Sequence, residues 1–304
     1  MPTRLLLNGK KAGQQDVRDA VYQLREEGHD LEVRTTWEGG DIERLILEAE
    51  QQGIHRIIAG GGDGTVNEVI DALLKHSLAH IQVAILPLGT ANDFATACGI
   101  PTASPYQSLL LALKGNAYRV DAARANERHF INIATAGFGA QITAKTPVTL
   151  KNLLGGGAYA LSGMVQALNF RPFNGTVLID GKQHKANIVV GALCNGRLAG
   201  GGQPLAPEAF LDDGYLDAFS LQGYTLADIS KVVEEIQNPN FEGVGFVNRN
   251  KVTRLEWDSQ QEMPINLDGE PIASLKVVME VLPKAIKLVL PENTTILKHR
   301  ELAD

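Results

Sequence analysis

The chain has 304 residues, of which 44% are hydrophobic and 21% are charged. These proportions are ordinary for a globular protein and exclude a wholly disordered chain, a collagen-like repeat and a long coiled coil. The length is about twice that of an average domain, so we expect two domains or one large α/β unit. The formal net charge of −7 excludes a global basic field for nucleic acid, and any contact with lipid has to be local.

The residues that follow Met1 lack the long apolar stretch and the small-residue cleavage site of a signal peptide, so we expect a cytoplasmic protein. Two cysteines, Cys98 and Cys194, are too few for a disulfide framework or a four-thiolate zinc site. Both stand in apolar surroundings, and we expect them in the core.

The first 120 residues alternate short apolar runs with longer amphipathic ones. This pattern predicts a largely parallel sheet that is covered by helices on both faces. The expected strands are Arg4–Leu7, Leu31–Thr35, Arg56–Ala59 and Ile81–Leu86, and the expected helices are Gln15–Glu27, Asp41–Gln52, Thr65–His76 and Ala91–Cys98.

Beyond Tyr118 the sequence becomes rich in short β-type runs, and Asp180-Gly181 between two of them is a hairpin signal. The second half therefore predicts an antiparallel sandwich or barrel. We place the boundary at 115–125, where Lys114-Gly115-Asn116 breaks the pattern. The expected strands are Arg119–Ala125, Phe130–Thr135, Val177–Ile179, Asn187–Leu193, Leu216–Leu221, Val252–Trp257, Leu275–Leu282 and Ile286–Leu290.

Residues 152–170 carry no charge and are nearly long enough to cross a bilayer. The run Gly155-Gly156-Gly157 and several polar residues argue against a spanning helix. Two interpretations stay open: a buried helix packed between the domains, or an apolar element that helps to seat an acyl chain. Lys145, Lys151 and Arg171 beside this segment form a candidate patch for membrane contact.

A glycine-rich loop, Gly60 to Gly64, stands directly between a predicted strand and a predicted helix. Glycines allow the backbone to approach a ligand closely, and the N-terminus of a helix offers unpaired N–H groups to an anion. The loop therefore predicts a phosphate-binding site. The alternative is a tight turn in which Asp63 or Thr65 only caps the helix. The spacing matches neither a Walker A loop nor the dinucleotide fingerprint Gly-x-Gly-x-x-Gly.

A second polar loop, Leu88-Gly89-Thr90-Ala91-Asn92-Asp93, follows the next predicted strand. Thr90 is a candidate cap for the helix after it, and Asn92 and Asp93 place polar groups in its first turn. Ligands of parallel sheets collect beyond the carboxyl ends of the strands, so we expect this loop beside the glycine-rich one.

These two loops, with Asn67-Glu68 after the first, closely resemble the diacylglycerol kinase catalytic domain. With Cys194-Asn195-Gly196-Arg197 and the late Asn266-Leu267-Asp268-Gly269-Glu270, the whole chain resembles the YegS-like bacterial lipid kinases. The resemblance implies an α/β nucleotide-binding domain over 1–120, related to NAD kinases and phosphofructokinases. It also implies an antiparallel β-sandwich over 121–290 that binds lipid and metal, a tail at about 291–304 that packs back on the first domain, and a cleft between the domains where ATP and lipid meet.

The resemblance also implies the ligands of each site. A divalent metal, Mg²⁺ or Ca²⁺, is expected in the second domain at Asp213 with the carbonyl oxygens of Phe210 and Tyr215. The first strand ends in Asn8-Gly9 where the family usually has Asn-Pro, so the part played by Asn8 is open. The implied ATP contacts are Thr36, Gly62, Asp63, Gly64, Thr65, Val66, Asn67, Glu68 and Thr90.

Phosphoryl transfer to an alcohol requires a group that accepts the hydroxyl proton. A carboxylate has an ordinary pKa of about 4 and is ionised at neutral pH. Asp268-Gly269-Glu270 supplies two carboxylates, and the family indicates Glu270 as the proton acceptor, with Asp268 orienting it or binding metal. The alternative is an exposed Asp-Gly hairpin turn without a catalytic role.

The leading prediction is an ATP- and Mg²⁺-dependent lipid kinase that phosphorylates a hydroxyl of a glycerolipid, with phosphatidylglycerol favoured over diacylglycerol. Such an enzyme would work in the cytoplasm and touch the inner face of the membrane transiently. A NAD kinase is the alternative enzyme, since it shares the Gly-Gly-Asp-Gly-Thr segment. A protein that senses ATP without transferring phosphate is the alternative from another class.

Overall fold

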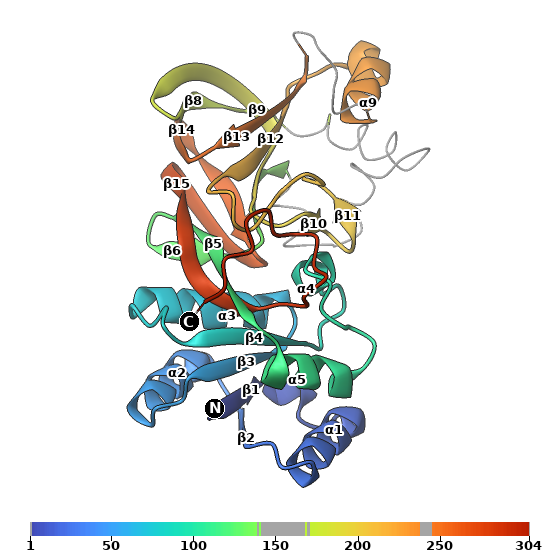
Figure 1. Cartoon of the computed structure of the whole chain (residues 1–304). Helices are drawn as coiled ribbons and strands as arrows, with labels where there is room; N and C mark the ends of the chain where they lie inside the picture. The colour runs from blue at the N-terminus through green and yellow to red at the C-terminus, as the bar shows by residue number, and fades with distance from the viewer. Residues whose placement is uncertain (1, 139, 141–167, 169–170, 238–244, 304) are drawn as a thin grey trace. The chain divides into compact units, whose positions relative to one another are not determined.

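The computed structural model describes residues 2–138, 140, 168, 171–237 and 245–303 (Figure 1). The chain forms two compact units. The first contains Met1–Ala122, Phe210–Gly214 and Leu282–Asp304, and the second contains Ala123–Ala209 and Tyr215–Val281. The uncharged segment 152–170 lies outside the described residues, apart from Leu168, as do Lys145 and Lys151. In the part of the chain that the structure describes, no helix is long and apolar enough to cross a membrane.

The first unit is a parallel sheet between two layers of helices. Its strands lie in the order β2, β1, β3, β4, β15, and neighbours along this order are parallel. The strands are β1 (Thr3–Leu7), β2 (Leu31–Thr35), β3 (Arg56–Gly61), β4 (Gln82–Pro87) and the last residues of β15 (Glu270–Val289). The helices are α1 (Gln15–Glu26), α2 (Asp41–Gln51), α3 (Asp63–Lys75), α4 (Asp93–Ala97) and α5 (Pro105–Lys114), with a 3-10 turn at Gly9–Lys11.

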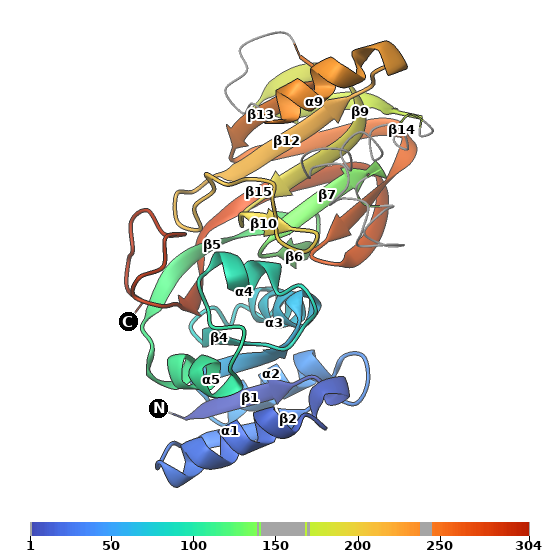
Figure 2. The same cartoon turned by 90° about the vertical axis from the view of Figure 1, so that its right-hand side faces the viewer.

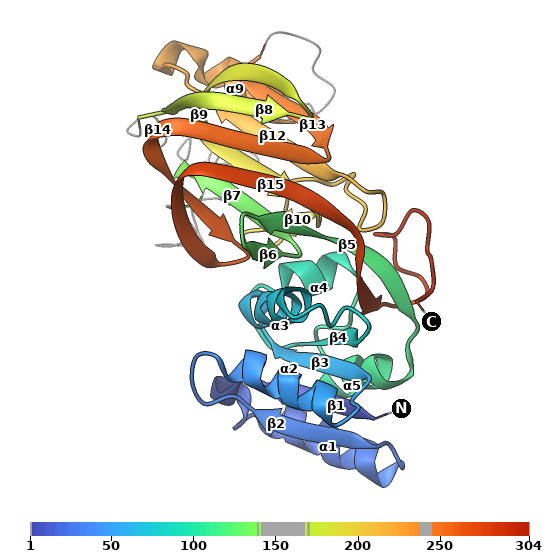
Figure 3. The same ribbon diagram turned by 90° about the vertical axis from the view of Figure 1, so that its left-hand side faces the viewer.

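Alternating side chains of the central strands bury both faces of this sheet. Leu5 and Leu7 of β1 pack with Leu24 of α1 and Leu109 of α5, and Leu6 between them is also fully buried. Helices α1 and α5 cover one face and α2 and α3 the other (Figures 2 and 3). The near-continuous apolar sequences of β1, β3 and β4 therefore reflect burial on both sides.

The second unit is antiparallel, as the β-rich half of the sequence predicts. Two long strands, β9 (Lys182–Cys194) and β14 (Arg254–Leu267), are bridged at one end by β8 (Phe173–Ile179) and at the other by β7 (Ile133–Gly137). These four strands close a ring, which is extended by the remaining strands and by one helix. They are the last residues of β5 (Ala117–Ala125), β6 (Arg128–Phe130), β12 (Leu216–Gln222), β13 (Val247–Val252) and the first part of β15; the helix is α9 (Ile229–Gln237), preceded by a 3-10 turn at Leu226–Asp228. The short strands β10 (Leu198–Ala199) and β11 (Gln203–Pro204) form a separate sheet.

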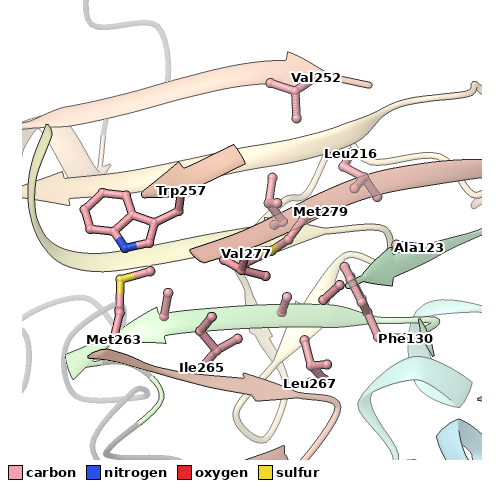
Figure 4. Packing of buried hydrophobic residues seen from close by; sticks show 14 of the residues in the cluster. Ala123, Phe130, Leu216, Val252, Trp257, Met263, Ile265, Leu267, Val277 and Met279 are labelled. Atoms are coloured by element: carbon pink, nitrogen blue, oxygen red, sulfur yellow. The ribbon is translucent and has the colours of Figure 1, made fainter. Parts of the chain in front are cut away.

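The second unit has two apolar cores. One contains Phe130, Trp257, Ile265 and Met279 and is shown in Figure 4. The other contains residues of β9 and β12 with Ile229 and Val232 of α9. Cys98 and Cys194 are buried, as expected. Burial raises the pKa of the Cys194 thiol, so this sulfur stays protonated and behaves as a small apolar group.

Candidate active site

The glycine-rich loop joins β3 to α3 without an intervening linker. Strand β3 ends at Gly61, Gly62 is the N-cap residue of α3, and the first helical hydrogen bond runs from the N–H of Val66 to the carbonyl of Gly62. The helix therefore begins at Asp63, two residues before the predicted start. The first N–H groups of any helix lack acceptors within the helix and favour an anion. The expected phosphate-binding residues thus stand in one loop and the first helical turns.

The second loop lies against the first, as expected for two loops that follow neighbouring parallel strands. A Cβ placed on Gly89 would lie 2.6 Å from the Cα of Gly62, so the two backbones touch where only glycine fits. The side chain of Asn92 closes the second loop, since its Oδ1 accepts from the N–H of Gly89 at 2.8 Å and its Nδ2 donates to the Gly89 carbonyl at 3.1 Å. The predicted cap was wrong: Thr90 is exposed, and Asn92 is the N-cap residue of α4.

Asp63 couples the two loops. Its carboxylate accepts hydrogen bonds from the N–H groups of Asp93 at 3.3 Å and Phe94 at 3.1 Å, which are the first N–H groups of α4. Burial raises the pKa of Asp63, and the hydrogen bond from Phe94 opposes this effect. Asp63 therefore caps the helix of the neighbouring loop and does not cap its own.

We expect Gly89→Ala to lower the affinity for ATP by about tenfold or more, because a Cβ at this position forces the two loops apart, and overpacking of this kind costs about 1–3 kcal/mol. Calorimetric titration with a non-hydrolysable ATP analogue measures the effect. Gly13→Ala is the matched control, since a Cβ there meets no atom within 4 Å. Unchanged affinity in Gly89→Ala would show that the contact of the loops does not matter for the nucleotide.

Asp63→Asn should lower stability by about 1–2 kcal/mol, because an amide cannot accept from both N–H groups and one end of α4 loses its cap. Urea unfolding followed by circular dichroism measures the change. Asp30→Asn alters an exposed acid of the same unit and serves as the control. Equal midpoints for the two variants would contradict the capping role of Asp63.

The ends of the first two strands meet near the same loop. The Nδ2 of Asn8 donates to Thr65 Oγ1 at 3.2 Å, and the N–H of Gly9 donates to Thr36 Oγ1 at 3.2 Å. A Cβ on Gly9 would overlap the carbonyl oxygen of Thr36, and a proline there would also lose this N–H donor. The departure from Asn-Pro thus keeps Thr36 and Asn8 at the carboxyl edge of the sheet, together with the glycine-rich loop.

In the second unit, Asp268-Gly269 is the two-residue turn of the hairpin formed by β14 and β15. Leu267 and Glu270 are opposite each other in the register, and both turn residues have positive φ, 48° and 105°. The alternative interpretation was right that this is a hairpin turn. It was wrong about exposure, since the side chain of Asp268 is buried and Glu270 is half-buried.

The carboxylate of Asp268 is held by three consecutive backbone N–H groups. Ile131 and Asn132 donate to Oδ2 at 2.8 and 3.0 Å, and Ile133 donates to Oδ1 at 2.6 Å. The side chain of Asn266 supports the same turn, because its Oδ1 accepts from the N–H of Gly269 at 2.8 Å. The turn that carries Glu270 is therefore anchored to the start of β7.

Two asparagines of this region were missed by the sequence analysis as site residues. Asn195 donates through Nδ2 to the carbonyl of Ile131 at 2.7 Å and through its backbone N–H to the carbonyl of Asn132 at 2.9 Å. Asn132 in turn donates through Nδ2 to the carbonyl of Leu198 at 3.1 Å. Both side chains are buried. Buried amides are the signal that could have marked them, but only the fold shows that they surround the anchor of Asp268.

The segment that contains Asp213 belongs to the first unit, whereas the sequence placed it in the second domain. The neighbouring Asp212 explains this difference. Its buried carboxylate accepts from the N–H groups of Lys298 and His299 at 2.6 Å and of Arg300 at 2.8 Å, which ties the segment to the end of the chain. Asp212 is thus a structural acid.

Asp121 was also missed by the sequence analysis. It is buried, and it accepts from the N–H groups of Gly214 at 2.7 Å and Lys284 at 2.8 Å. Burial raises the pKa of Asp121, and the charges of Asp213 and Asp212 raise it further. The carboxylates of Asp213 and Asp212 therefore lie close enough to Asp121 to disfavour its charged form.

The residues around Asp213 fit a hard divalent cation by their chemistry. One carboxylate and two main-chain carbonyls, those of Phe210 and Tyr215, form the kind of oxygen set that Mg²⁺ and Ca²⁺ prefer. Gly214 has a φ of 77°, so the chain turns sharply between Asp213 and Tyr215. Among the described residues, no group of three or more His, Cys, Asp or Glu side chains has the arrangement of a metal site. Any metal here depends on the carbonyl oxygens.

Two family models together cover most of the chain. The model of the diacylglycerol kinase catalytic domain matches residues 2–125, and that of the YegS C-terminal NAD kinase β-sandwich-like domain matches residues 132–290. A protein described as a probable YegS-like lipid kinase from Shewanella frigidimarina is 49% identical over 95% of this chain and 94% of its own length. The chain belongs to the YegS-like family of lipid kinases. A second relative of the same description, from Chromohalobacter salexigens, is 45% identical over 98% and 96% of the two chains.

The crystal structure of a diacylglycerol kinase from Bacillus anthracis strain Sterne has the same fold. It is 24% identical in sequence, covers 97% of this chain and 98% of its own, and gives a TM-score of 0.73. The predicted fold class, an α/β domain followed by a β-sandwich, is thereby confirmed, and so is the prediction of a lipid kinase. The YegS-like relatives support that prediction over a NAD kinase.

Proposed function

We propose that the protein transfers the γ-phosphoryl group of ATP to a hydroxyl of a glycerolipid, with phosphatidylglycerol as the first candidate. The observation that carries this proposal is the contact of the two polar loops through Gly62 and Gly89 at the N-terminus of α3. It supports a phosphate-binding site of two converging loops, and the family supplies the lipid acceptor.

The residues proposed to hold ATP belong to the first unit. The N–H groups in the first turn of α3 face the phosphates, and the side chains of Thr65 and Thr36 stand beside them at the carboxyl edge of the sheet. Gly64 leaves room, since a Cβ there would meet no protein atom within 4 Å. The remaining proposed contacts are Asp63, Val66, Asn67, Glu68 and Thr90.

Glu270 accepts the proton of the lipid hydroxyl as its oxygen attacks the phosphorus. The O–H bond breaks and leaves its electron pair on the attacking oxygen, and the new O–P bond forms. The bond between the γ-phosphorus and the bridging oxygen of ATP breaks, and ADP leaves with the electron pair of that bond. Asp268 does not take this proton, because its carboxylate is buried and occupied by three N–H groups. We assign to Asp268 the positioning of the turn that carries Glu270.

A divalent cation held by Asp213 and the carbonyls of Phe210 and Tyr215 would offset the negative charge of the phosphate groups that the kinase binds. We expect Asp213→Asn to raise the Mg²⁺ concentration needed for half-maximal activity by about tenfold or more, because one formal charge is removed from the oxygen set. Activity as a function of Mg²⁺, and of Ca²⁺ in parallel, measures this. An unchanged metal dependence would remove the metal from this segment.

The reaction is tested with radiolabelled ATP and separate mixed micelles of phosphatidylglycerol, diacylglycerol and monoacylglycerol, with free NAD as a further acceptor. Label in phosphatidylglycerol at the highest kcat/KM is the expected result. Label in NAD alone would overturn the proposal. Binding of ATP without transfer to any acceptor, with Glu270→Gln indistinguishable from the parent, would favour an ATP sensor.

We also propose that the enzyme works in the cytoplasm and touches the inner face of the membrane transiently. Apart from the lipid acceptor, support comes from exposed apolar side chains, Leu226 and Leu275, and from the exposed Arg171 next to the uncharged segment. Sedimentation with vesicles of phosphatidylglycerol, compared with vesicles of phosphatidylcholine, measures this contact. Equal sedimentation in the two cases would exclude a role for anionic lipid.

A further inference from the structure

The second unit contains a cavity that the proposed reaction does not use. Its volume is about 710 Å³, which lies within the range of small-molecule sites. Residues of β7, β8, β9, β12, β13 and β14 line it, with Met279 of β15. Asp268, Gly269 and Glu270 are not among them. Figure 4 shows Trp257, Met263 and Met279, which form part of its wall.

Small residues from three neighbouring strands, β12, β9 and β7, line one side of the cavity. Leu193 of β9 pairs with Ala218 of β12 on one side and with Ala134 of β7 on the other. In the next inward-facing row Gly191 of β9 is paired with Ala136 of β7. A Cβ on Gly191 would meet its nearest neighbours, Ala136 and Ile188, at 3.5 and 3.7 Å, so an alanine there would make ordinary van der Waals contacts. Side chains of average size would fill the space that these residues leave.

The wall of the cavity is apolar and partly exposed to solvent. Val177 is buried, whereas Ile179, Ile188 and Leu255 are only half-buried although they pack on the core. Each leaves apolar surface in contact with water, and covering that surface is favourable. An apolar chain is the kind of ligand that gains from such a wall, since it needs no directed hydrogen bonds along its length.

The rim of the cavity is cationic. Lys182, Lys185 and Lys251 line it with His184. Lys251 is paired with Asp217 at 3.2 Å, whereas Lys182 and Lys185 have no ion-pair partner among the described residues.

Asp180 is the one acid that lines the cavity, and its Oδ1 is already occupied. It accepts from the N–H groups of Thr253 and Arg254 at 3.1 and 2.9 Å and from the Thr253 hydroxyl at 2.7 Å. The rim is therefore complementary to an anionic head group.

Trp257 forms part of the inner wall of the cavity. Its side chain is 1% exposed, and its indole nitrogen is buried. Figure 4 places the nitrogen on the edge that faces Met263, which also lines the cavity. In the register, Trp257 lies one row inward from Lys182, because Trp257 pairs with Val177 and Lys182 pairs with Ile179. Trp257 therefore contributes apolar surface below the cationic rim.

We propose that this cavity binds one acyl chain of an anionic phospholipid. The phosphate of the head group lies at Lys182 and Lys185, and the chain runs past Trp257 and over the small residues of β7, β9 and β12. This is a second lipid site, separate in its residues from Glu270 and from the nucleotide loops, and it does not rest on the proposed reaction.

The test uses Trp257 as the reporter. The chain has two tryptophans, and Trp37 is 95% exposed, so Trp37→Phe leaves Trp257 as the single emitter. Bromine atoms quench tryptophan emission only at close approach. The Trp37→Phe protein, without ATP, is titrated with bromostearoyl lysophosphatidylglycerol, with the neutral bromostearoyl glycerol and with bromostearate, each below its micelle-forming concentration.

The expected result is saturable quenching by the lysophospholipid, with affinity about tenfold higher than for the neutral ester. In the Trp37→Phe background, Lys182→Gln with Lys185→Gln should lower this affinity by about tenfold, whereas Lys276→Gln, on the exposed surface outside the cavity, should not change it. Absent quenching, or equal affinity for the neutral ester, overturns the proposal. Preference for bromostearate overturns the phospholipid in favour of a free fatty acid.

Filling the cavity gives an independent test in the same background. Gly191→Leu places a side chain in the open space and should abolish saturable quenching, whereas Gly191→Ala keeps most of the space and should bind like the parent. Circular dichroism shows whether the leucine variant is folded, and the lysine variants on the rim test the proposal if it is not. Full quenching in a folded Gly191→Leu protein would place the chain elsewhere.

Discussion

Replacing Glu270 by glutamine is expected to lower kcat for lipid phosphorylation by about 10²- to 10⁴-fold while the affinity for ATP stays unchanged. Glu270 stands on the hairpin turn of β14 and β15, half-buried, at a position fixed by its pairing with Leu267. Glutamine preserves the shape and cannot take the proton of the hydroxyl. Steady-state transfer of labelled phosphate measures kcat, and calorimetry with a non-hydrolysable analogue measures ATP affinity.

Glu262→Gln is the matched control, because Glu262 is an exposed acid of β14, the strand that pairs with β15, and lies outside the turn. It should retain the parental kcat. A kcat for Glu270→Gln within about threefold of the parent would remove the carboxylate from proton transfer, since general-base catalysis supplies far more than that. A parallel loss of ATP affinity would instead place Glu270 in nucleotide binding.

The pattern of alternating strands and helices predicted the first unit well because each element buries its own apolar face. The strand at Leu31–Thr35 has the predicted bounds, and the helix at α1 differs by one residue. Helix α5 was not predicted, although Ser104 caps it and Pro105 begins it. The consecutive leucines Leu109–Leu111 do not alternate with polar residues at helical spacing, so they do not indicate which side of the helix is buried. Packing against α1 and β4 determines that side.

The second unit was predicted as a class but not as a topology. Leu275–Leu282 and Ile286–Leu290 were separated at Pro283-Lys284, yet they form one strand, β15. Lys284 takes a positive φ of 54° and its N–H bonds to Asp121, so the strand bends without ending. Helix α9 was missed because its β-branched residues favour strands in isolation. Contacts such as that of Lys284 with Asp121 join residues far apart in the chain, so the local sequence does not indicate them.

The candidate site was likewise predicted only in part. Glycine spacing indicated the two loops, since the backbone there needs glycine whatever surrounds it. Which acid of an adjacent pair points inward could not be predicted, because the partners lie far along the chain. Asp212 is held by Lys298–Arg300, and Asp268 by Ile131–Ile133. The resemblance indicated Asp213 as a metal ligand and Glu270 as the proton acceptor, and it left Asp268 either to orient Glu270 or to bind metal.

Asp268→Asn is expected to destabilise the protein by about 3–5 kcal/mol. Its carboxylate accepts three backbone N–H groups while it is buried, and an amide has one oxygen and an NH₂ group that would face a donor. Urea unfolding measured by circular dichroism and by Trp257 emission reports the loss. Asp258→Asn, at an exposed acid of β14 that pairs with Lys276 at 2.7 Å, should cost under about 1 kcal/mol.

The stability of Asp268→Asn also decides between the two roles of this acid. A positioning residue makes the variant unstable, and at low temperature, where it remains folded, activity should fall without a change in the pH profile, since the proton acceptor is still Glu270. A proton acceptor at position 268 would instead leave stability near the parental value and remove the acidic limb of the profile, where activity falls as the carboxylate becomes protonated. Parental stability with lost activity would therefore return Asp268 to the chemistry and displace Glu270 from it.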